Sequence, residues 1–273
     1  MITVKPLSLS EFQSGATRTS EPITNAAHLL QVSPASGAVD LTRPFLGSDQ
    51  LPVLEDEGGE RTFGRVIPDD PAQAAAAAAW VRKLGVKSVE VFRDTTAFGR
   101  TMAVAFRQAL GGIRPVAKGG RLIYYAGVAG DEPPAVRNAK VPVMGSDALL
   151  PPYSTGHQRA ELATSAAQAP PQLPASGRRF VASFQRRYRR APGRYAAYGY
   201  EAMAVVLNAI RRAGSQGDQR QPVIDAFFAT RGRRSVLGTY SINAFGDMTL
   251  NRISGYRLRA GVEPRPQALL PAR

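Results

Sequence analysis

Apolar residues first gather in the run His28 to Val32, whose sequence HLLQV predicts a short buried strand. The run ends in Ser-Pro-Ala-Ser-Gly, residues 33–37, a series of small or turn-forming residues unsuited to a core. The following segment, residues 44–64, is rich in turn residues and carries an acidic loop at its centre. Small, turn-forming residues directly after a buried strand predict a loop with exposed backbone.

The clearest helix is predicted around an uninterrupted alanine run, residues 74–79, because alanine has the highest helix propensity. Asp70 is expected to cap this helix, with Pro71 at the first helical position. Near its end, Arg82 complements the helix dipole and Gly85 suits the residue just beyond the helix.

Strands and helices then alternate, which is typical of an α/β chain with a parallel sheet. Strands are predicted at residues 86–92, 121–127 and 141–145, and helices at residues 99–110, 133–139, 178–190, 195–212 and 222–230. The Pro-rich segment 168–177 is expected to cross between two lobes. Further strands follow, joined by a turn that contains Asp247, and the tail after Gly261 is expected to fray because it holds three prolines.

Composition narrows the chemistry. The chain has no cysteine, which excludes disulfides, thiolate zinc sites and cysteine nucleophiles. His28 and His157 are its only histidines, so a histidine-rich metal site is excluded as well. No apolar run approaches the roughly 20 residues that a membrane-spanning helix needs, and residues 1–12 do not resemble a signal peptide.

The net charge of +14 raises the question of an anionic partner. Its densest part is residues 178–190, where Phe180, Phe184 and Tyr188 recur every four residues and arginines fill much of the rest. This spacing predicts an amphipathic helix, whose basic side is either a solvated face or a surface for an anionic partner. No nucleic-acid-binding motif accompanies the charge, so a nucleic-acid partner is not expected.

In an open α/β sheet, ligands bind beyond the carboxyl ends of the strands. Several loops with unusual chemistry leave predicted strand ends here and are expected to converge on one cleft; they begin at Ser33, Arg93, Val128 and Ser146.

These loops carry a family resemblance. The segments SGATRTSEPITNAAHLLQVSPASGAVDLT, VFRDTTAFGRTMAVAFRQAL, LIYYAGV, VPVMGSDALL, YAAYGYEAM and VLGTYSINAFGDM resemble, in this order, the type I periplasmic binding proteins of the leucine/isoleucine/valine-binding family of ABC transporters. The match extends over most of Ser14 to Gly261. Compared with the family pattern, the chain looks truncated at its N-terminus and lacks a helix where only Lys118 to Gly120 intervene.

The resemblance implies a two-lobed type I α/β fold, with parallel sheets flanked by helices and an incomplete N-terminal lobe. Residues 1–66 and 168–250 are expected to form that lobe, and residues 67–167 and 251–273 the C-terminal lobe. The implied function is binding of an amino acid, or a related small zwitterion or amide, by hinge closure, followed by delivery to an ABC permease. No cofactor is implied, and the implied location is periplasmic or otherwise extracytoplasmic.

The resemblance also implies a set of ligand-binding positions: Ser14, Ala35, Ser36, Gly37, Phe98, Val128, Asp147 and Tyr200. Ser14 matches a serine that holds the ligand carboxylate, and Asp147 matches an acid that pairs with the ligand ammonium. Phe98 matches an aromatic lid, Val128 stands where amino-acid binders carry an aromatic residue, and Tyr200 is expected near the rim.

Other interpretations remain open from the residues themselves. Ser14, Ser36 and Asp147 can be ordinary turn or cap residues, and Asp247 is expected to act in its turn. The chain can also be the ligand-sensing part of a regulator or receptor, or a fragment that binds nothing. No nucleophile–base pair, paired carboxylates, phosphate loop or metal cluster is visible in the sequence, so an enzyme is not expected.

Overall fold

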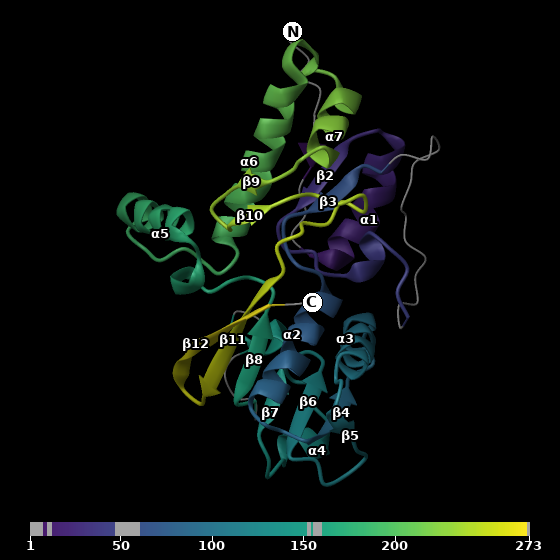
Figure 1. Cartoon of the computed structure of the whole chain (residues 1–273), viewed down its shortest axis with the longest axis vertical. Coiled ribbons are helices and arrows are strands. Elements are labelled where there is room, and N and C mark those ends of the chain that lie inside the picture. Colours follow the sequence, from purple (N-terminus) through teal and green to yellow (C-terminus); the bar gives the residue numbers. More distant parts are fainter. Residues whose placement is uncertain (1–7, 10–12, 47–60, 152–153, 155–159, 272–273) are drawn as a thin grey trace. The chain divides into compact units, whose positions relative to one another are not determined.

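The computed structural model describes residues 8–9, 13–46, 61–151, 154 and 160–271, which form two compact units. Unit 1 consists of Met1–Pro44, Leu51–Pro68 and Ala169–Leu250, and unit 2 of Phe45–Gln50, Asp69–Gln168 and Asn251–Arg273. Each unit has its own sheet with helices beside it (Figure 1). Within the described residues, no helix combines the length and the apolar character needed to cross a membrane.

The sheet of unit 1 is small and parallel, in the order β1 (Ser8–Leu9), β2 (Leu30–Ser33) and β3 (Phe63–Arg65). All of β2 is buried, which confirms the strand predicted from the HLLQV run. The short strand β3 lies inside the segment that the sequence analysis interpreted as turns, and that interpretation is wrong at this point.

Helices α1, α6 and α7 pack against the β2 strand of unit 1, and α5 follows a 3₁₀ turn, η3. Unit 1 also contains a second 3₁₀ turn, η1, a third, η4, and a two-stranded antiparallel hairpin, β9–β10. Their bounds are α1 (Ser14–Ala26), η1 (Val39–Leu41), η3 (Pro170–Gln172), α5 (Ala175–Tyr188), α6 (Ala196–Ala213), η4 (Gly214–Gln216), α7 (Arg220–Phe228), β9 (Arg233–Arg234) and β10 (Thr239–Tyr240).

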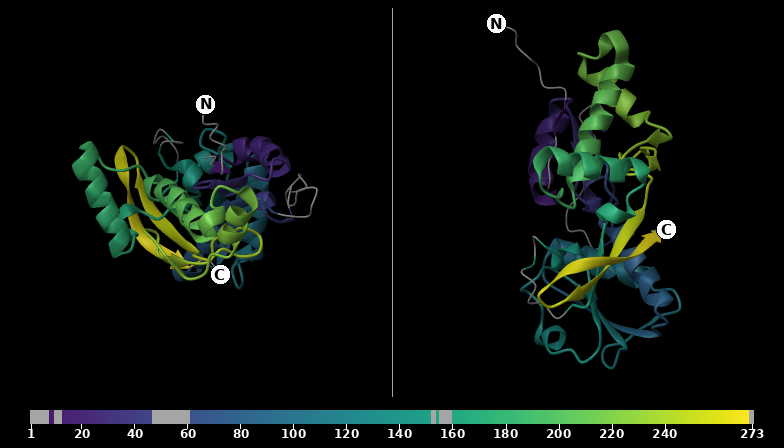
Figure 2. Two further views of the ribbon diagram at one scale, coloured as in Figure 1. Left: turned by 90° about the horizontal axis from the view of Figure 1, so that it is seen from above. Right: turned by 90° about the vertical axis from the view of Figure 1, so that its left-hand side faces the viewer.

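Unit 2 has a seven-stranded sheet in the order β12-β11-β8-β7-β6-β4-β5. The strands from β8 to β5 are parallel, whereas β11 pairs antiparallel with both β8 and β12. Its elements are α2 (Asp70–Lys83), β4 (Ser88–Arg93), α3 (Ala97–Gln108), β5 (Arg114–Pro115), β6 (Leu122–Ala126), α4 (Pro134–Arg137), β7 (Val143–Gly145), η2 (Asp147–Leu149), β8 (Leu162–Ser165), β11 (Arg252–Arg259) and β12 (Val262–Pro271). Figure 2 shows the long β11–β12 ribbon from two further sides.

The alanine-rich helix α2 forms as predicted, but its cap lies one residue earlier. The Asp69 carboxylate accepts the backbone N–H of Ala72 at 2.8 Å, so Asp69, and not Asp70, is the N-cap. Gly85 has φ +74°, which is the left-handed conformation expected just after a helix.

A short connection replaces a helix between β5 and β6. Both strands flank β4, because Val89 lies opposite Pro115 on one side and opposite Leu122 on the other. The connection passes close to β4 at Gly120, whose N–H donates to Glu90 Oε1 at 2.9 Å. A Cβ atom at Gly120 would lie only 2.8 Å from the Glu90 nitrogen, so glycine permits this close passage and the sheet stays continuous.

The expectation that the tail after Gly261 frays is wrong. This segment forms β12, which pairs antiparallel with β11 from Arg259↔Val262 to Arg252↔Pro271. Among the described strands β12 pairs only with β11, so it is an edge strand, where prolines are tolerated since one side of the strand needs no partner.

Candidate functional site

The loop after β2 is shaped by its own first residue. Ser33 Oγ accepts the backbone N–H groups of Ala35 at 3.2 Å and Ser36 at 2.9 Å, which turns the chain sharply. Ser33 and Ser36 are fully buried, whereas Ala35 and Gly37 are half-buried, so the expectation that this stretch is exposed is wrong. We call residues 33–38 the small-residue loop.

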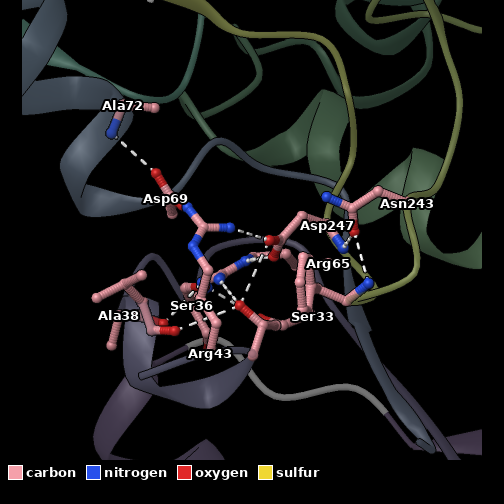
Figure 3. Close-up of polar contacts among 12 residues, drawn as sticks. Ser33, Ser36, Ala38, Arg43, Arg65, Asp69, Ala72, Asn243 and Asp247 are labelled. Carbon is pink, nitrogen blue, oxygen red and sulfur yellow. Dashed lines mark hydrogen bonds and ion pairs between the residues drawn. The ribbon is translucent and has the colours of Figure 1, made fainter. Parts of the chain in front are cut away.

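A buried arginine holds this loop from β3. Arg65 is completely buried, and its guanidinium donates to the carbonyl oxygens of Ser36 at 3.0 Å and Ala38 at 2.8 Å (Figure 3). Its Nε forms a 2.6 Å ion pair with Asp247, whose other carboxylate oxygen pairs with Arg43 at 2.7 Å. Because the Ser36 and Ala38 carbonyls accept hydrogen bonds from the same buried guanidinium, Arg65 restrains the conformation of the loop.

Asp247 is more than the turn residue that the sequence analysis expected. Its turn does exist, since Asn243 Oδ1 accepts the backbone N–H groups of Phe245 and Asp247, both at 2.9 Å. The Asp247 side chain is the counter-ion of the fully buried Arg65. Sequence reasoning missed Arg65 because it directly follows the turn-rich segment 44–64, and a charged residue in that position gives no sign of burial.

The N-terminus of α1 adjoins the small-residue loop. Ser14 Oγ accepts the backbone N–H of Ala38 at 3.1 Å, which leaves the Ser14 hydroxyl hydrogen as a donor. The hydroxyls of Thr17 and Ser36 lie 2.7 Å apart, and a single bond between them uses one of their two hydrogens. Hydroxyl donors beside the positive end of a helix dipole suit an anion such as a carboxylate.

A buried carboxyl, Glu21, lies further along the same helix. Loss of hydration on burial, the largest cause, raises the pKa of Glu21 to about 8, and Arg65 opposes the shift. The Glu21 side chain is therefore mostly neutral at pH 7. The inner face of α1 is polar throughout, because Thr17, Thr24 and Asn25 are also buried.

In unit 2, one carboxylate organises the loops that carry Phe98 and Val128. Asp94 Oδ1 accepts the Thr96 N–H at 2.9 Å and the Thr96 hydroxyl at 2.6 Å, while Oδ2 accepts the Val128 N–H at 2.9 Å. The loop after β4 and the loop after β6 are thus joined at Asp94. Phe98 and Val128 are both half-buried beside this junction.

The packing around Asp94 leaves no room for larger residues. A Cβ atom at Gly99 would lie 2.1 Å from Asp94 Oδ1, and one at Gly127 would lie 2.8 Å from Asp94 Oδ2. Sequence reasoning recognised these loops but not Asp94 as their anchor, although an aspartate directly after a strand and two residues before Thr96 is a signal of such a turn.

Asp147 begins the 3₁₀ turn η2 after β7 and is half-buried. Gln73 Nε2, on the buried side of α2, donates to Asp147 Oδ1 at 3.1 Å and to the Thr164 carbonyl at 2.9 Å. The cap of η2 is Ser146, whose Oγ accepts the Ala148 N–H, so Asp147 is not itself the cap residue.

The structure therefore gathers the sequence-predicted residues into separate groups. Ser14 and the small-residue loop lie together in unit 1, and Phe98 and Val128 lie together in unit 2, where Asp147 contacts Gln73. Tyr200 lies in α6, 53% exposed, with its ring packed against Phe180. His157 lies outside the described residues. Among the described residues, no group of three or more histidine, aspartate or glutamate side chains is placed to hold a metal ion.

The chain has the fold of the type I periplasmic binding proteins, the solute-binding proteins of ABC transporters. It is similar to a leucine-binding protein from Thermotoga maritima, with 21% identity, a TM-score of 0.73, and coverage of 97% of this chain and 80% of that one. An ABC transporter substrate-binding protein from Desulfitobacterium hafniense in complex with leucine gives 19% identity, a TM-score of 0.74, and coverage of 96% and 80%.

A third structure, a solute-binding protein from R. palustris in complex with benzoate, has 16% identity, a TM-score of 0.71, and coverage of 98% of this chain and 78% of that one. No protein-family model and no curated protein matches the sequence. The likeness confirms the predicted fold class, and the matched structures are binding proteins rather than enzymes.

Proposed function

We propose that the chain is the solute-binding component of an ABC-type uptake system and binds a small carboxylate ligand. The observation that carries this proposal is the group of donors at the start of α1, where the Ser14 hydroxyl adjoins a loop locked by Arg65. Preorganised donors bind an anion without first having to be ordered, which favours affinity.

The ligands of the similar structures support a carboxylate rather than one particular molecule. Leucine, isoleucine, benzoate and 3,4-dihydroxybenzoic acid are the ligands of four of them, and each carries a carboxylate group. Only the first two also carry an ammonium group. The donors around Ser14 would bind the carboxylate that these ligands share. Asp147 would bind the ammonium that only the amino acids carry.

Our specific proposal is an amino acid, branched-chain-like, or a related small zwitterion or amide. Its carboxylate would meet Ser14, Ser36 and Gly37 of unit 1, and its ammonium would meet Asp147 of unit 2 when the two lobes close on it. Phe98 and Val128 would contact its apolar part. Val128 is smaller than the aromatic residue of amino-acid binders, so a wider ligand than leucine would fit. Ala35 and Tyr200 stay predictions of the resemblance.

The proposed setting follows from the fold. We infer that the loaded protein works outside the cytoplasmic membrane and delivers its ligand to the membrane subunits of an ABC permease. No catalysed reaction is proposed, because binding and release suffice for this role.

A three-ligand comparison tests the proposal. Leucine, 4-methylpentanoate, which lacks the ammonium, and isopentylamine, which lacks the carboxylate, are measured by thermal shift and calorimetry. Leucine should bind most tightly, 4-methylpentanoate more weakly, and isopentylamine weakest. If 4-methylpentanoate binds as tightly as leucine or more tightly, the carboxylate site stands and the zwitterion proposal fails.

Two substitutions separate the ends of the ligand. Ser14→Ala should weaken every carboxylate ligand about tenfold or more, roughly 1.4 kcal/mol. Asp147→Asn should weaken leucine to a similar degree but leave 4-methylpentanoate unchanged. The matched controls are Thr19→Ala, an exposed hydroxyl of α1, and Asp131→Asn, an exposed acid of unit 2. Equal effects of test and control variants would contradict the site.

A further inference from the structure

Helix α5 buries fewer residues than the other α-helices of unit 1. Gly177 is its only buried residue, whereas α6 buries seven residues along one face. Its first turn is fixed: the Ser176 hydroxyl donates to the Ser235 carbonyl at 2.7 Å, and a Cβ atom at Gly177 would lie 2.2 Å from the Val236 carbonyl oxygen. The whole helix has 14 residues and is about 21 Å long. Beyond its first turn, none of its residues is buried.

An apolar strip runs along α5 and continues onto α6. The rings of Phe184 and Tyr188 lie 4.6 Å apart, those of Phe180 and Phe184 lie 6.1 Å apart, and those of Phe180 and Tyr200 lie 5.0 Å apart. The strip is then extended along α6 by exposed residues three and seven positions after Tyr200, which are Met203 and Leu207. Between 51% and 58% of the surface of Tyr188, Tyr200, Met203 and Leu207 is exposed.

The same region carries a one-sided charge. Residues 162–200 contain seven arginines and no acidic residue: Arg178, Arg179, Arg186, Arg187, Arg189, Arg190 and Arg194. The six from Arg178 to Arg190 are exposed. The side chains of Arg179, Arg187 and Arg190 form no hydrogen bond or ion pair with any residue that the structure describes.

We propose that α5, with the adjoining Tyr200, Met203 and Leu207, binds an anionic lipid bilayer surface. An amphipathic helix with arginines on its polar side and aromatic residues on the other is suited to lying in the headgroup region. Tyrosine suits that region because it has an apolar ring and a polar end. Arginine supplies attraction to lipid phosphates, and no acidic residue in this segment opposes it.

The apolar strip favours a lipid surface over a nucleic acid. Arginines alone would serve for contact with a phosphate backbone. Exposed Met203 and Leu207 have no counterpart in such a contact, whereas a bilayer covers them and removes their apolar surface from water. A solute-binding role does not require this surface, so the inference stands apart from the proposed function.

The test measures partition of the full chain onto vesicles of phosphatidylglycerol and phosphatidylcholine, with pure phosphatidylcholine as reference. Each arginine near an anionic surface changes binding by about fivefold, so the triple variant R179S/R187S/R190S should lose roughly a hundredfold. The control R252S/R257S/R259S removes the same charge from exposed positions of β11 and should change binding less than threefold.

Removal of apolar contacts distinguishes insertion from simple attraction. Phe184→Ser with Tyr188→Ser should reduce partition about tenfold, while Phe184→Leu should retain it. In Tyr188→Trp, vesicles should shift the fluorescence of the new tryptophan to shorter wavelength, because Trp80 is 3% exposed and contributes a constant signal. Since α5 buries only Gly177, these variants should melt like the wild type.

Three outcomes overturn the proposal. Equal losses in the α5 and β11 arginine variants would show that net charge alone attracts the chain. Absence of a fluorescence shift for Tyr188→Trp would exclude insertion of the strip. Binding of a fluorescein-labelled oligonucleotide that exceeds vesicle binding, and that survives Phe184→Ser with Tyr188→Ser, would identify a nucleic-acid surface instead.

Discussion

Both units bury an apolar core, but they differ in how they use buried charge. Unit 2 has an apolar interior, in which Phe106 and Tyr124 stack at 3.7 Å and Trp80 packs against Gly255 of β11. Unit 1 buries a complete ion pair between Arg65 and Asp247. The inner face of its helix α1 consists of hydroxyl, amide and carboxyl groups.

This difference follows from what surrounds the candidate ligand-binding groups. In unit 2, the carboxylate of Asp94 accepts hydrogen bonds from the loops after β4 and β6. These buried polar contacts are therefore confined to the two loops. Unit 1 holds the small-residue loop through the fully buried Arg65, so the stability of this part of unit 1 depends on a buried charge. Unit 1 should therefore respond far more to pH and to loss of a single polar group.

The largest expected effect is that of Arg65→Met. It removes the buried guanidinium that pairs with Asp247 and donates to the carbonyls of Ser36 and Ala38. Asp247 keeps its ion pair with the partly exposed Arg43, but loss of the buried partner should still cost unit 1 about 3–5 kcal/mol. Trp80, the only tryptophan, lies in unit 2, so its fluorescence reports that unit while circular dichroism reports both. In urea, the circular dichroism transition should split, and the fluorescence transition should stay in place.

The companion variant is Arg65→Met with Asp247→Leu, which removes both charges and should recover part of the loss. A loss below about 1 kcal/mol for Arg65→Met would show that the ion pair is not central to unit 1. A matching shift in Trp80 fluorescence would show that the two units do not unfold independently.

Asp94→Ala should have the next largest effect, and in unit 2. Removing the acceptor of the Thr96 and Val128 N–H groups should cost about 2–3 kcal/mol, since buried donors lose their partners. Here the Trp80 fluorescence transition should move, while the unit 1 part of the circular dichroism transition stays. Thr95→Ala, an exposed neighbour, is the control. If Asp94→Ala leaves the fluorescence transition in place, Asp94 does not stabilise the two loops.

The elements of unit 2 were largely predictable, because their patterns are local. The α2 helix has an alanine run, a capping aspartate and Gly85, and the strands β4, β6 and β7 are apolar runs of ordinary length. The predicted cap, Asp70, is one residue later than the observed cap, Asp69. Two adjacent aspartates precede Pro71, so the sequence alone does not distinguish them. The β12 strand was missed because its prolines are compatible with a strand only at a sheet edge, and edge position depends on tertiary structure.

The site in unit 1 was predictable only in part. The resemblance pointed to Ser14 and Ser36. In the structure, α1, which begins at Ser14, is hydrogen-bonded to the small-residue loop, which contains Ser36. Arg65 and Asp247 are 182 residues apart in sequence, and neither has a local pattern that indicates a buried partner. Burial of a charge depends on a distant residue, and a single sequence contains no signal for that pairing.

The smallest expected effect concerns pH and Glu21. Burial raises its pKa from the ordinary 4.5 to about 8, so between these pH values the folded state holds a proton that the unfolded state has lost. The stability of unit 1 should therefore be full below pH 4.5, fall as the pH rises toward 8, and level off above it. Because water reaches the carboxyl when the unit opens locally, we expect a loss of roughly 2 kcal/mol.

Glu21→Gln has nearly the same shape and no proton to lose, so it should flatten this profile. It should be more stable than the wild type at pH 8 and no more stable at pH 4.5, as measured by urea unfolding followed by circular dichroism. Glu263→Gln, an exposed acid of unit 2, should leave the profile unchanged. Two results would contradict this: a wild-type stability that rises with pH, or a pH dependence that Glu21→Gln does not flatten. Either would mean that Glu21 is paired or hydrated in solution. The contrast between the two units would then no longer include Glu21.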